Sequence, residues 1–199
     1  MELELAQLPA LERYKILIGL VIPRPIAWVS TLSENGVANC APFSFFNVIS
    51  EDPPLCILSF NWRSDGAIKH TLKNIRRTGE FVVNLADEGT ANQMHLSGTE
   101  LPESESEFKS YGLTPAPAKL VKHPRIAEAA ASFECKVERR INFGPEREMV
   151  VGEILLIHAR DGIIDPVTKR ISEELYRPIG RLFANRYCST AQRFNLPKQ

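Results

Sequence analysis

The chain has 199 residues, 44% of them hydrophobic, with 24 basic and 24 acidic side chains. This length favours one domain, covering residues 1–199, that buries a substantial core. A net charge of zero provides no long-range attraction for nucleic acid or an anionic membrane, so we expect neither as a partner.

The compartment is predicted from the N-terminus and the cysteines. The first twenty residues include three glutamates and no apolar run typical of a signal peptide, and no later stretch is apolar for long enough to span a membrane. We therefore expect a cytoplasmic protein. Four cysteines lack the spacing of metal ligands, and we expect them to be reduced, structural thiols: Cys40, Cys56, Cys135 and Cys188.

The N-terminal third predicts antiparallel strands. An apolar, β-branched run at 25–32 leads into Asn35-Gly36, a pair that favours a two-residue hairpin turn. The returning arm, 37–46, contains Pro42, which cannot donate to a ladder and so indicates an edge, a bulge or the end of regular pairing. Residues 55–60 are apolar on both faces, as in a buried barrel strand.

A helix is predicted next. Apolar side chains repeat at helical spacing over 68–75, Ser64 or Asp65 can cap the helix, and Gly79 ends it before a strand at 81–85.

The remainder of the chain predicts more strands than helices. A second helix is expected at 87–96, and 97–124 has the composition of a surface excursion with one short helix at about 104–111. Long β-runs follow at 131–143 and 149–160. Because strand and helix do not alternate as in a doubly wound sheet, we expect a mostly β protein, an antiparallel barrel with peripheral helices.

Two stretches carry polar side chains where the strand pattern falters. The first, 28–31, ends in two hydroxyl groups whose simplest role is cross-strand hydrogen bonding. In the second, 39–47, Ser44 and Asn47 interrupt an apolar run around a proline. This pattern is equally typical of a bulge with a satisfied serine and of a backbone turned toward a ligand.

A third stretch, 61–74, predicts an anion site. Arg63 precedes the expected helix, and Lys69 and Thr71 lie in its first turns. A helix N-terminus has unpaired N–H groups and a partial positive charge, so added cations favour a phosphate. The chain has neither a GxGxxG nor a P-loop motif that would bind phosphate in another way. The alternative is a solvated basic face, which further cations of this helix favour: Lys73, Arg76 and Arg77.

Metal-dependent and serine-hydrolase chemistry find no support. The sequence has no HExxH spacing, no acidic cluster near a histidine and no GxSxG elbow, so we expect no metal. The histidines are His70, His95, His123 and His158.

The segment 176–187 crowds arginines and aromatic rings around a proline and a glycine. Guanidinium groups stack on rings or pair with anions, so this segment is prone to bind a ligand. The alternative is a C-terminal segment that is simply tied down.

At these same stretches the sequence resembles the flavin reductase-like family, which includes flavoredoxins and the reductase components of two-component monooxygenases. The resemblance covers roughly residues 15–190, with motifs in family order. They are RPIAWVST at 24–31, NCAPFSFFN at 39–47, DPPL at 52–55, KHTLKNI at 69–75, GEFVVNL at 79–85, YGLTPAP at 111–117, FECKV at 133–137, VVGEI at 150–154, RPIGRL at 177–182 and NRY at 185–187.

The resemblance implies an FMN-binding split barrel with Greek-key antiparallel strands, a homodimer, and FMN held non-covalently near the dimer interface. It implies that the flavin and its ribityl chain are lined by Trp28, Val29, Ser30, Thr31, Ala41, Pro42, Phe43 and Ser44, with Asn47 nearby. It assigns the phosphate to Arg63, Lys69 and Thr71, and the substrate side to Arg181, Asn185 and Tyr187.

The implied activity is transfer of a hydride from NAD(P)H to FMN and on to free flavin, oxygen, a metal complex or a partner oxygenase. Hydride chemistry belongs to the flavin, so no side chain is required as a catalytic acid or base. The alternatives are a flavoredoxin-like electron carrier without direct nicotinamide turnover, and a chain that has kept the fold and lost the cofactor. The sequence departs from the family at His70, where an aspartate is usual, and at Phe183, where small residues are usual.

Overall fold

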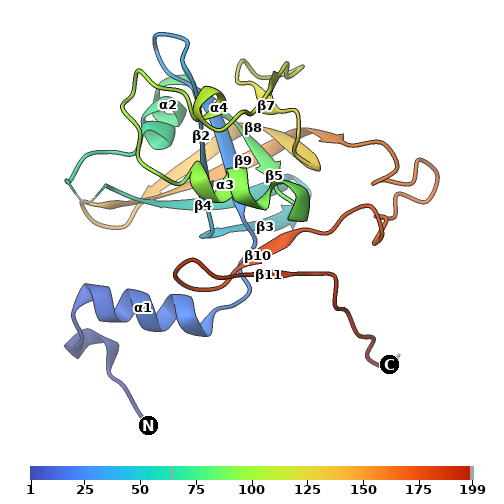
Figure 1. Cartoon of the computed structure of the whole chain (residues 1–199). Helices are drawn as coiled ribbons and strands as arrows, with labels where there is room; N and C mark the ends of the chain where they lie inside the picture. The colour runs from blue at the N-terminus through green and yellow to red at the C-terminus, as the bar shows by residue number, and fades with distance from the viewer. Residues whose placement is uncertain (64, 198–199) are drawn as a thin grey trace.

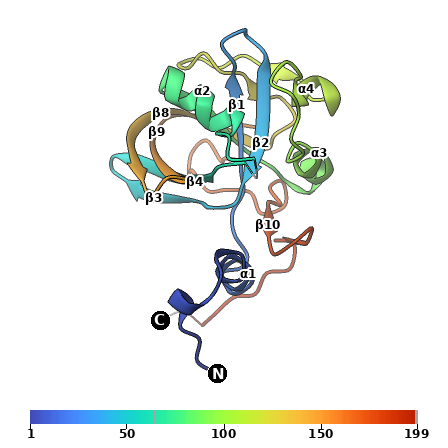
Figure 2. The same ribbon diagram turned by 90° about the vertical axis from the view of Figure 1, so that its left-hand side faces the viewer.

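The structure, a computed structural model, describes residues 1–63 and 65–197. Its centre is a seven-stranded antiparallel sheet in the order β2-β1-β5-β8-β9-β4-β3, which curls into a barrel (Figures 1 and 2). The expectation of a mostly β, antiparallel barrel with peripheral helices is confirmed. The strands are β1 (Ala27–Leu32), β2 (Ala38–Phe43), β3 (Phe46–Glu51), β4 (Pro54–Asn61), β5 (Glu80–Leu85), β8 (Ala131–Asn142) and β9 (Arg147–Ala159).

The first hairpin has a longer loop than predicted. Ser33 and Val37 form the last cross-strand bond, with Ser33 N–H donating to the Val37 carbonyl over 2.9 Å. Gly36 has a φ of 75°, whereas Asn35 is outside the left-handed region. A three-residue loop with glycine in the left-handed position therefore joins β1 and β2, and the expected two-residue turn is wrong.

Pro42 lies on an edge strand, one of the three predicted situations. It faces Trp28 across the β1–β2 ladder, and β2 is the first strand of the sheet order. The returning arm does not continue to residue 46, because the chain leaves β2 after Phe43 and begins β3 at the opposite edge. The two edge strands of the open barrel, β2 and β3, therefore follow each other directly in the sequence.

Helix α2 (His70–Thr78) begins later than predicted. Asp65 accepts from Ala67 N–H over 2.9 Å in a turn that precedes the helix, so its prediction as the cap is wrong. Ser64, the other predicted cap, lies outside the described residues. Gly79 ends the helix as predicted, with a φ of 70° and its N–H donating to the Ile75 carbonyl.

The helical segments predicted at 87–96 and about 104–111 are present, whereas the helix at 10–20 was not predicted. A capping box at Asp87 starts the second helical segment. The excursion 97–124 runs over the surface but buries Phe108 and Leu113 beside Trp28. Around the barrel lie η1 (Leu5–Gln7), α1 (Ala10–Leu20), η2 (Glu88–Thr90), α3 (Ala91–Leu96), α4 (Glu107–Ser110), β6 (Pro115–Ala116), β7 (Arg125–Ile126), β10 (Ile179–Arg181) and β11 (Tyr187–Ser189).

Two clusters of buried apolar residues form the core. The larger fills the barrel, where Leu72 and Ile75 of α2 meet Phe60 and Phe81 from the sheet. The smaller surrounds Trp28 on the outer side of β1 and β2. All four cysteines are free thiols, and three of them are fully buried.

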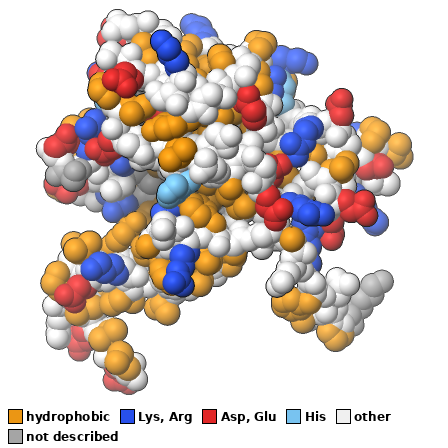
Figure 3. Space-filling model, viewed as in Figure 1, with side chains coloured by type: hydrophobic (Ala, Val, Ile, Leu, Met, Phe, Trp, Pro, Cys, Tyr) orange, Lys and Arg blue, Asp and Glu red, His pale blue; other side chains and the backbone are white. Residues whose placement is uncertain are grey.

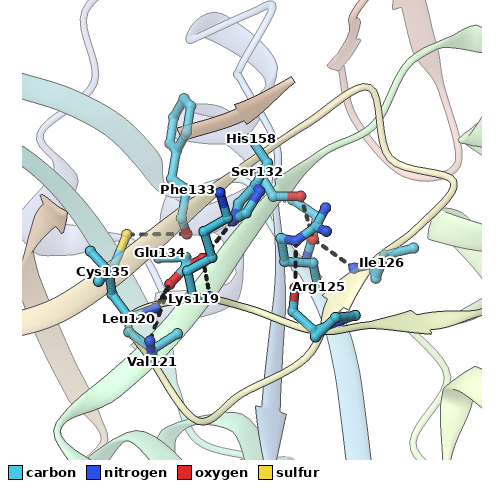
Figure 4. A network of polar contacts seen from close by, with 12 residues as sticks. Lys119, Leu120, Val121, Arg125, Ile126, Ser132, Phe133, Glu134, Cys135 and His158 are labelled. Atoms are coloured by element: carbon cyan, nitrogen blue, oxygen red, sulfur yellow. Dashed lines mark hydrogen bonds and ion pairs between the residues drawn. The ribbon is translucent and has the colours of Figure 1, made fainter. Parts of the chain in front are cut away.

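A buried carboxylate fastens the excursion to the barrel (Figure 4). Glu134 of β8 accepts hydrogen bonds from the backbone N–H groups of Lys119, Leu120 and Val121 at 2.6–3.1 Å. His158 of β9 lies 2.5 Å from the same carboxylate. The loop 119–121 is therefore held by one side chain of the sheet.

Helix α1 stands apart from the sheet, at the end of the molecule where β10 and β11 lie (Figures 1 and 2). In the described part of the chain, α1 has no buried residue. Among residues 1–63 and 65–197, no helix is long and apolar enough to cross a membrane.

Candidate functional site

A pocket of about 550 Å³ opens at the end of the edge strand β2, next to β4 and the start of α2. Its wall combines the end of β2 and the following turn, the start of α2, the loop after α3, and residues of α1 and β9. Predicted site residues from three separate segments meet there: Ala41, Pro42, Phe43, Ser44, Arg63, Lys69, Thr71, Arg181 and Tyr187.

The β1 stretch lies behind this wall. Trp28, Val29, Ser30 and Thr31 are fully buried and outside the pocket lining. The Ser30 hydroxyl accepts from Asn84 of the neighbouring strand β5, and Thr31 is 3.3 Å from Asn39, its partner on β2. These contacts match the alternative of cross-strand hydrogen bonding.

Trp28 still supports the pocket indirectly. Its indole N–H donates to the Ser97 hydroxyl over 2.8 Å, and Ser97 lines the pocket. The two other predicted residues, Asn47 and Asn185, are exposed and lie outside the lining. Asn47 accepts from the neighbouring Val48 N–H.

One end of the pocket is basic. Arg63, Lys69 and His70, here called the basic cluster, line it at the start of α2. An Arg63 Nη atom lies 3.3 Å from His70 Nε2. Arg63 Nε is buried and, within the described residues, makes no hydrogen bond. Glu100 approaches it to 3.4 Å and approaches Lys69 to 3.8 Å.

The other cations of α2 have partners elsewhere, which separates them from the basic cluster. Lys73 pairs with Glu103 at 2.8 Å, Arg76 pairs with the buried Glu148, and Arg77 donates to the Leu32 carbonyl. Lys73 and Arg77 are exposed, so the alternative of a solvated basic face applies to that side of the helix, whereas the first turn of α2 faces the pocket.

Thr71 is a fixed member of the wall. Its side chain is buried, and its hydroxyl donates to Asn39 Oδ1 over 3.1 Å. Asn39 in turn donates to the Glu107 carboxylate over 3.0 Å. This network connects the first turn of α2 to β2 and α4.

The opposite end is formed by the C-terminal hairpin and α3. Arg181 lies 4.6 Å from the ring centroid of Tyr187 and donates to its hydroxyl. His95 Nδ1 is 2.9 Å from the same hydroxyl. Burial raises the pKa of Tyr187, and Arg181 partly offsets this effect. The sequence did not single out His95 for this position, because its partner is distant in the chain.

Arg24 joins three segments at the pocket wall. It donates to the carbonyls of Ile18 and Val21 at the end of α1, to the carbonyl of Leu182, and to the Ser44 hydroxyl at 3.3 Å. Burial is the main cause that lowers the pKa of this guanidinium. Arg24 begins the RPIAWVST motif, yet its contacts with both ends of the chain are visible only in the fold.

The sequence patterns also did not predict the residues on a third side of the pocket. Arg147 of β9 lies 5.7 Å from the ring centroid of Phe45, and Tyr14 of α1 meets the same ring edge-on at 6.4 Å. Arg147 follows an exposed turn in the sequence, and no motif singled it out. In the part of the chain that the structure describes, no group of three or more metal-binding side chains occurs.

Comparisons with known proteins give this pocket a context. The chain is 46% identical over 174 residues to an uncharacterized protein of Aquifex aeolicus, covering 87% of this chain and 88% of that one. It is similar to the 2-nitrobenzoate 2-nitroreductase NbaA of Pseudomonas fluorescens, with 36% identity, a TM-score of 0.92, and coverage of 100% and 96%.

A second solved structure, nitrilotriacetate monooxygenase component B of Bacillus cereus, has 31% identity, a TM-score of 0.92 and coverage of 98% of both chains. The model of the flavin reductase like domain matches residues 19–172, more than half of the sequence. The chain therefore belongs to the flavin reductase-like family of split-barrel proteins.

Proposed function

We propose that the protein is an FMN-dependent oxidoreductase that passes a hydride from NAD(P)H to FMN and on to an acceptor. The observation that carries this proposal is the basic cluster at the start of α2, in a pocket that also presents aromatic and apolar side chains and, at its other end, Arg181. FMN is an anion at one end and a flat, mostly apolar ring system at the other. The acceptor is free flavin, oxygen or a partner oxygenase.

The phosphate is assigned to the basic cluster. Arg63 and Lys69 supply charge, and the first turn of α2 supplies backbone N–H groups without intrahelical partners. The buried Arg63 Nε, which makes no hydrogen bond within the described residues, is a donor that a phosphate oxygen would satisfy. Thr71 orients this turn through Asn39.

The ring system is assigned to the wall at 41–44. In the described residues β2 has a strand neighbour on one side only. On its outer side Cys40 N–H and the Ala38 carbonyl are taken by Glu107 and Ser106, so the backbone that could face a ligand is the part beyond them, at 42–44. When bound, FMN supplies the hydride chemistry, and N–H groups of this wall would stabilise negative charge on the reduced ring. Pro42 and Phe43 add apolar surface.

Arg181 and Tyr187 are proposed to bind the electron donor. Nicotinamide dinucleotides are anionic, and Arg181 brings a guanidinium to the end of the pocket opposite the basic cluster. The hydroxyl of Tyr187 fixes the direction of that guanidinium. A partner oxygenase as acceptor is supported by the similarity to component B of a monooxygenase.

We also propose that the protein is a homodimer with FMN near the interface. Apolar side chains gather on α1, the limb at the lower left of Figure 3. Leu11, Leu17 and Leu20 of this helix are exposed in the single chain, as are Val48 and Ile49 of the edge strand β3. Such surfaces favour burial against a second copy. Light scattering should give twice the chain mass, and Leu20→Glu should lower it toward the monomer.

Anaerobic stopped-flow absorbance tests the activity. The protein is loaded with FMN, freed of excess flavin and mixed with NADH or NADPH. Bleaching of the flavin band at a rate compatible with turnover supports the proposal. Loaded protein that neither nicotinamide reduces would instead be a flavoredoxin-like carrier. Protein that takes up no FMN would contradict the cofactor assignment as well.

A further inference from the structure

The loop after α3 places an acid on the proposed phosphate site. Glu100 Oε2 lies 3.4 Å from Arg63 Nε, and Glu100 Oε1 lies 3.8 Å from Lys69 Nζ. Each carboxylate oxygen thus faces one cation of the basic cluster. All three residues line the same pocket.

This contact is loose for a charged pair. Charge-assisted N–H···O bonds are usually about 2.7–2.9 Å long, and both distances here are greater. Arg63 Nε is buried without a hydrogen bond among the described residues, although Glu100 lies 3.4 Å from it. Asp65 lies 3.5 Å from Arg63 Nη2 but outside the pocket lining, so Glu100 is the acid that faces the phosphate site. The carboxylate therefore neutralises the cations without satisfying their donors, and its side chain is 45% exposed.

The segment that carries Glu100 is anchored on both sides. Before it, the Ser97 hydroxyl accepts from Trp28 and donates to the Met94 carbonyl. After it, Glu103 pairs with Lys73 at 2.8 Å. Glu100 lies between these fixed points and can leave the cations by rotation of its side chain.

A phosphate monoester is a stronger ligand for the same cations. It carries a charge of about −1.5 to −2 at neutral pH and three acceptor oxygens, against a single charge and two oxygens for a carboxylate. Two anions cannot share Arg63 and Lys69 without repulsion. Binding of the phosphate therefore requires the carboxylate to withdraw.

We propose that Glu100 is an internal competitor for the FMN phosphate. Its carboxylate and the phosphate occupy the same two cations in turn, which weakens the retention of FMN and favours its exchange. The inference rests on the proposed function and deepens it, because it concerns how firmly the same site holds its cofactor. It predicts an effect on FMN and none on riboflavin, which lacks the phosphate.

The test is Glu100→Gln, which removes the charge and keeps the shape. Binding of FMN and of riboflavin is measured by quenching of flavin fluorescence, at low and at high salt. We expect the Kd for FMN to fall about tenfold at low salt and the Kd for riboflavin to change less than about twofold. The dissociation rate of FMN should fall in the same proportion, and high salt should reduce the difference.

Glu103→Gln is the matched control. It removes the same charge from the same loop, and its ion pair with Lys73 lies outside the pocket lining. We expect its FMN affinity to equal that of the wild type. Equal effects of both variants would mean a general field effect and would overturn the assignment to Glu100.

Two further outcomes would also overturn the inference. One is unchanged FMN affinity in Glu100→Gln, which would show that the carboxylate withdraws without cost. The other is weaker binding, which would make Glu100 a residue that orients the cations. If riboflavin and FMN bind equally to all three proteins, or bind to none, the phosphate or cofactor assignment itself fails. Circular dichroism establishes that each variant is folded.

Discussion

The Leu32 backbone N–H donates to Nδ1 of His123 over 2.9 Å, so the end of β1 is tied to the segment between α4 and β7. Nε2 of the same ring is 2.9 Å from the Thr78 hydroxyl. With Nδ1 as acceptor, the proton of the neutral ring lies on Nε2. His123 is 1% exposed and therefore acts as a buried, neutral connector.

We predict that mild acidification destabilises the folded protein through His123. Burial, the largest cause, lowers its pKa from the ordinary value of 6.5. The unfolded chain binds the proton more readily than the folded one. The contribution of neutral His123 to the free energy of unfolding is therefore complete above about pH 6.5 and decreases as the pH falls toward the folded-state pKa. Thermal melts between pH 7.5 and 5.5 should show a fall in Tm that is smaller in His123→Asn. Parallel curves for the two proteins would contradict this role.

Glu134 predicts a larger effect on folding. Glu134→Gln leaves one amide oxygen and an NH₂ group where three backbone N–H groups and His158 now meet a carboxylate. We expect a loss of about 2–4 kcal/mol in the free energy of unfolding. Urea titration at pH 7 measures it. Glu138→Gln, at an exposed position of the same strand, is the control and should change stability by less than about 0.5 kcal/mol.

The stability that the Glu134 carboxylate contributes should also depend on pH in the acid range. Burial raises its pKa, but His158 and the three N–H groups outweigh burial and hold the pKa of Glu134 below its ordinary value of 4.5. Its contribution is therefore present above about pH 4.5 and is lost as the pH falls through the folded-state value. The stability difference between wild type and Glu134→Gln should shrink below that pH. A constant difference would contradict this assignment.

Gly152 predicts an overpacked core on substitution. A Cβ at this position of β9 would lie 2.5 Å from Phe81 Cζ and 3.0 Å from Cε1. Gly152→Ala should cost about 1–3 kcal/mol in urea unfolding, because Phe81 is enclosed in the barrel and can move little. Gly19→Ala in α1, where a Cβ meets no atom within 4 Å, is the control. Equal stability of the two variants would contradict the close approach.

The basic cluster predicts a phosphate-specific loss of binding. Arg63→Gln should raise the Kd for FMN about tenfold to a hundredfold, the range expected for hydrogen bonds to a charged group. Its affinity for riboflavin should stay within about twofold of the wild type. Lys73→Gln, four residues after Lys69 and outside the pocket lining, is the control and should leave FMN binding unchanged. Loss of riboflavin binding in Arg63→Gln would point to damage of the pocket as a whole.

The sequence predicted which helices and strands form better than it predicted the residues where they begin. Gly79 ends α2 as its position required, because its φ of 70° is open to glycine at low cost. The start of α2 was misplaced, since Asp65 serves a tight turn that competes with capping. Propensity alone does not decide between two local uses of one side chain.

The site was predictable where neighbours in sequence act together. Ala41 to Ser44 share one wall, and Arg63 and Lys69 share one end of the pocket. Arg147, His95 and Tyr14 were not predicted as site residues, because each contacts a partner that is distant in the chain. Such contacts depend on how strands and helices pack in the folded chain, which periodicity does not encode.

The pocket wall includes residues from Tyr14 to Tyr187, and Arg24 links α1 to the carbonyl of Leu182. A ribosome must therefore synthesise nearly the whole chain before this wall is complete. The sheet, whose last strand ends at Ala159, can form earlier. Capture of a ligand by the finished pocket thus follows barrel formation, and the nascent barrel must rely on its own core for stability.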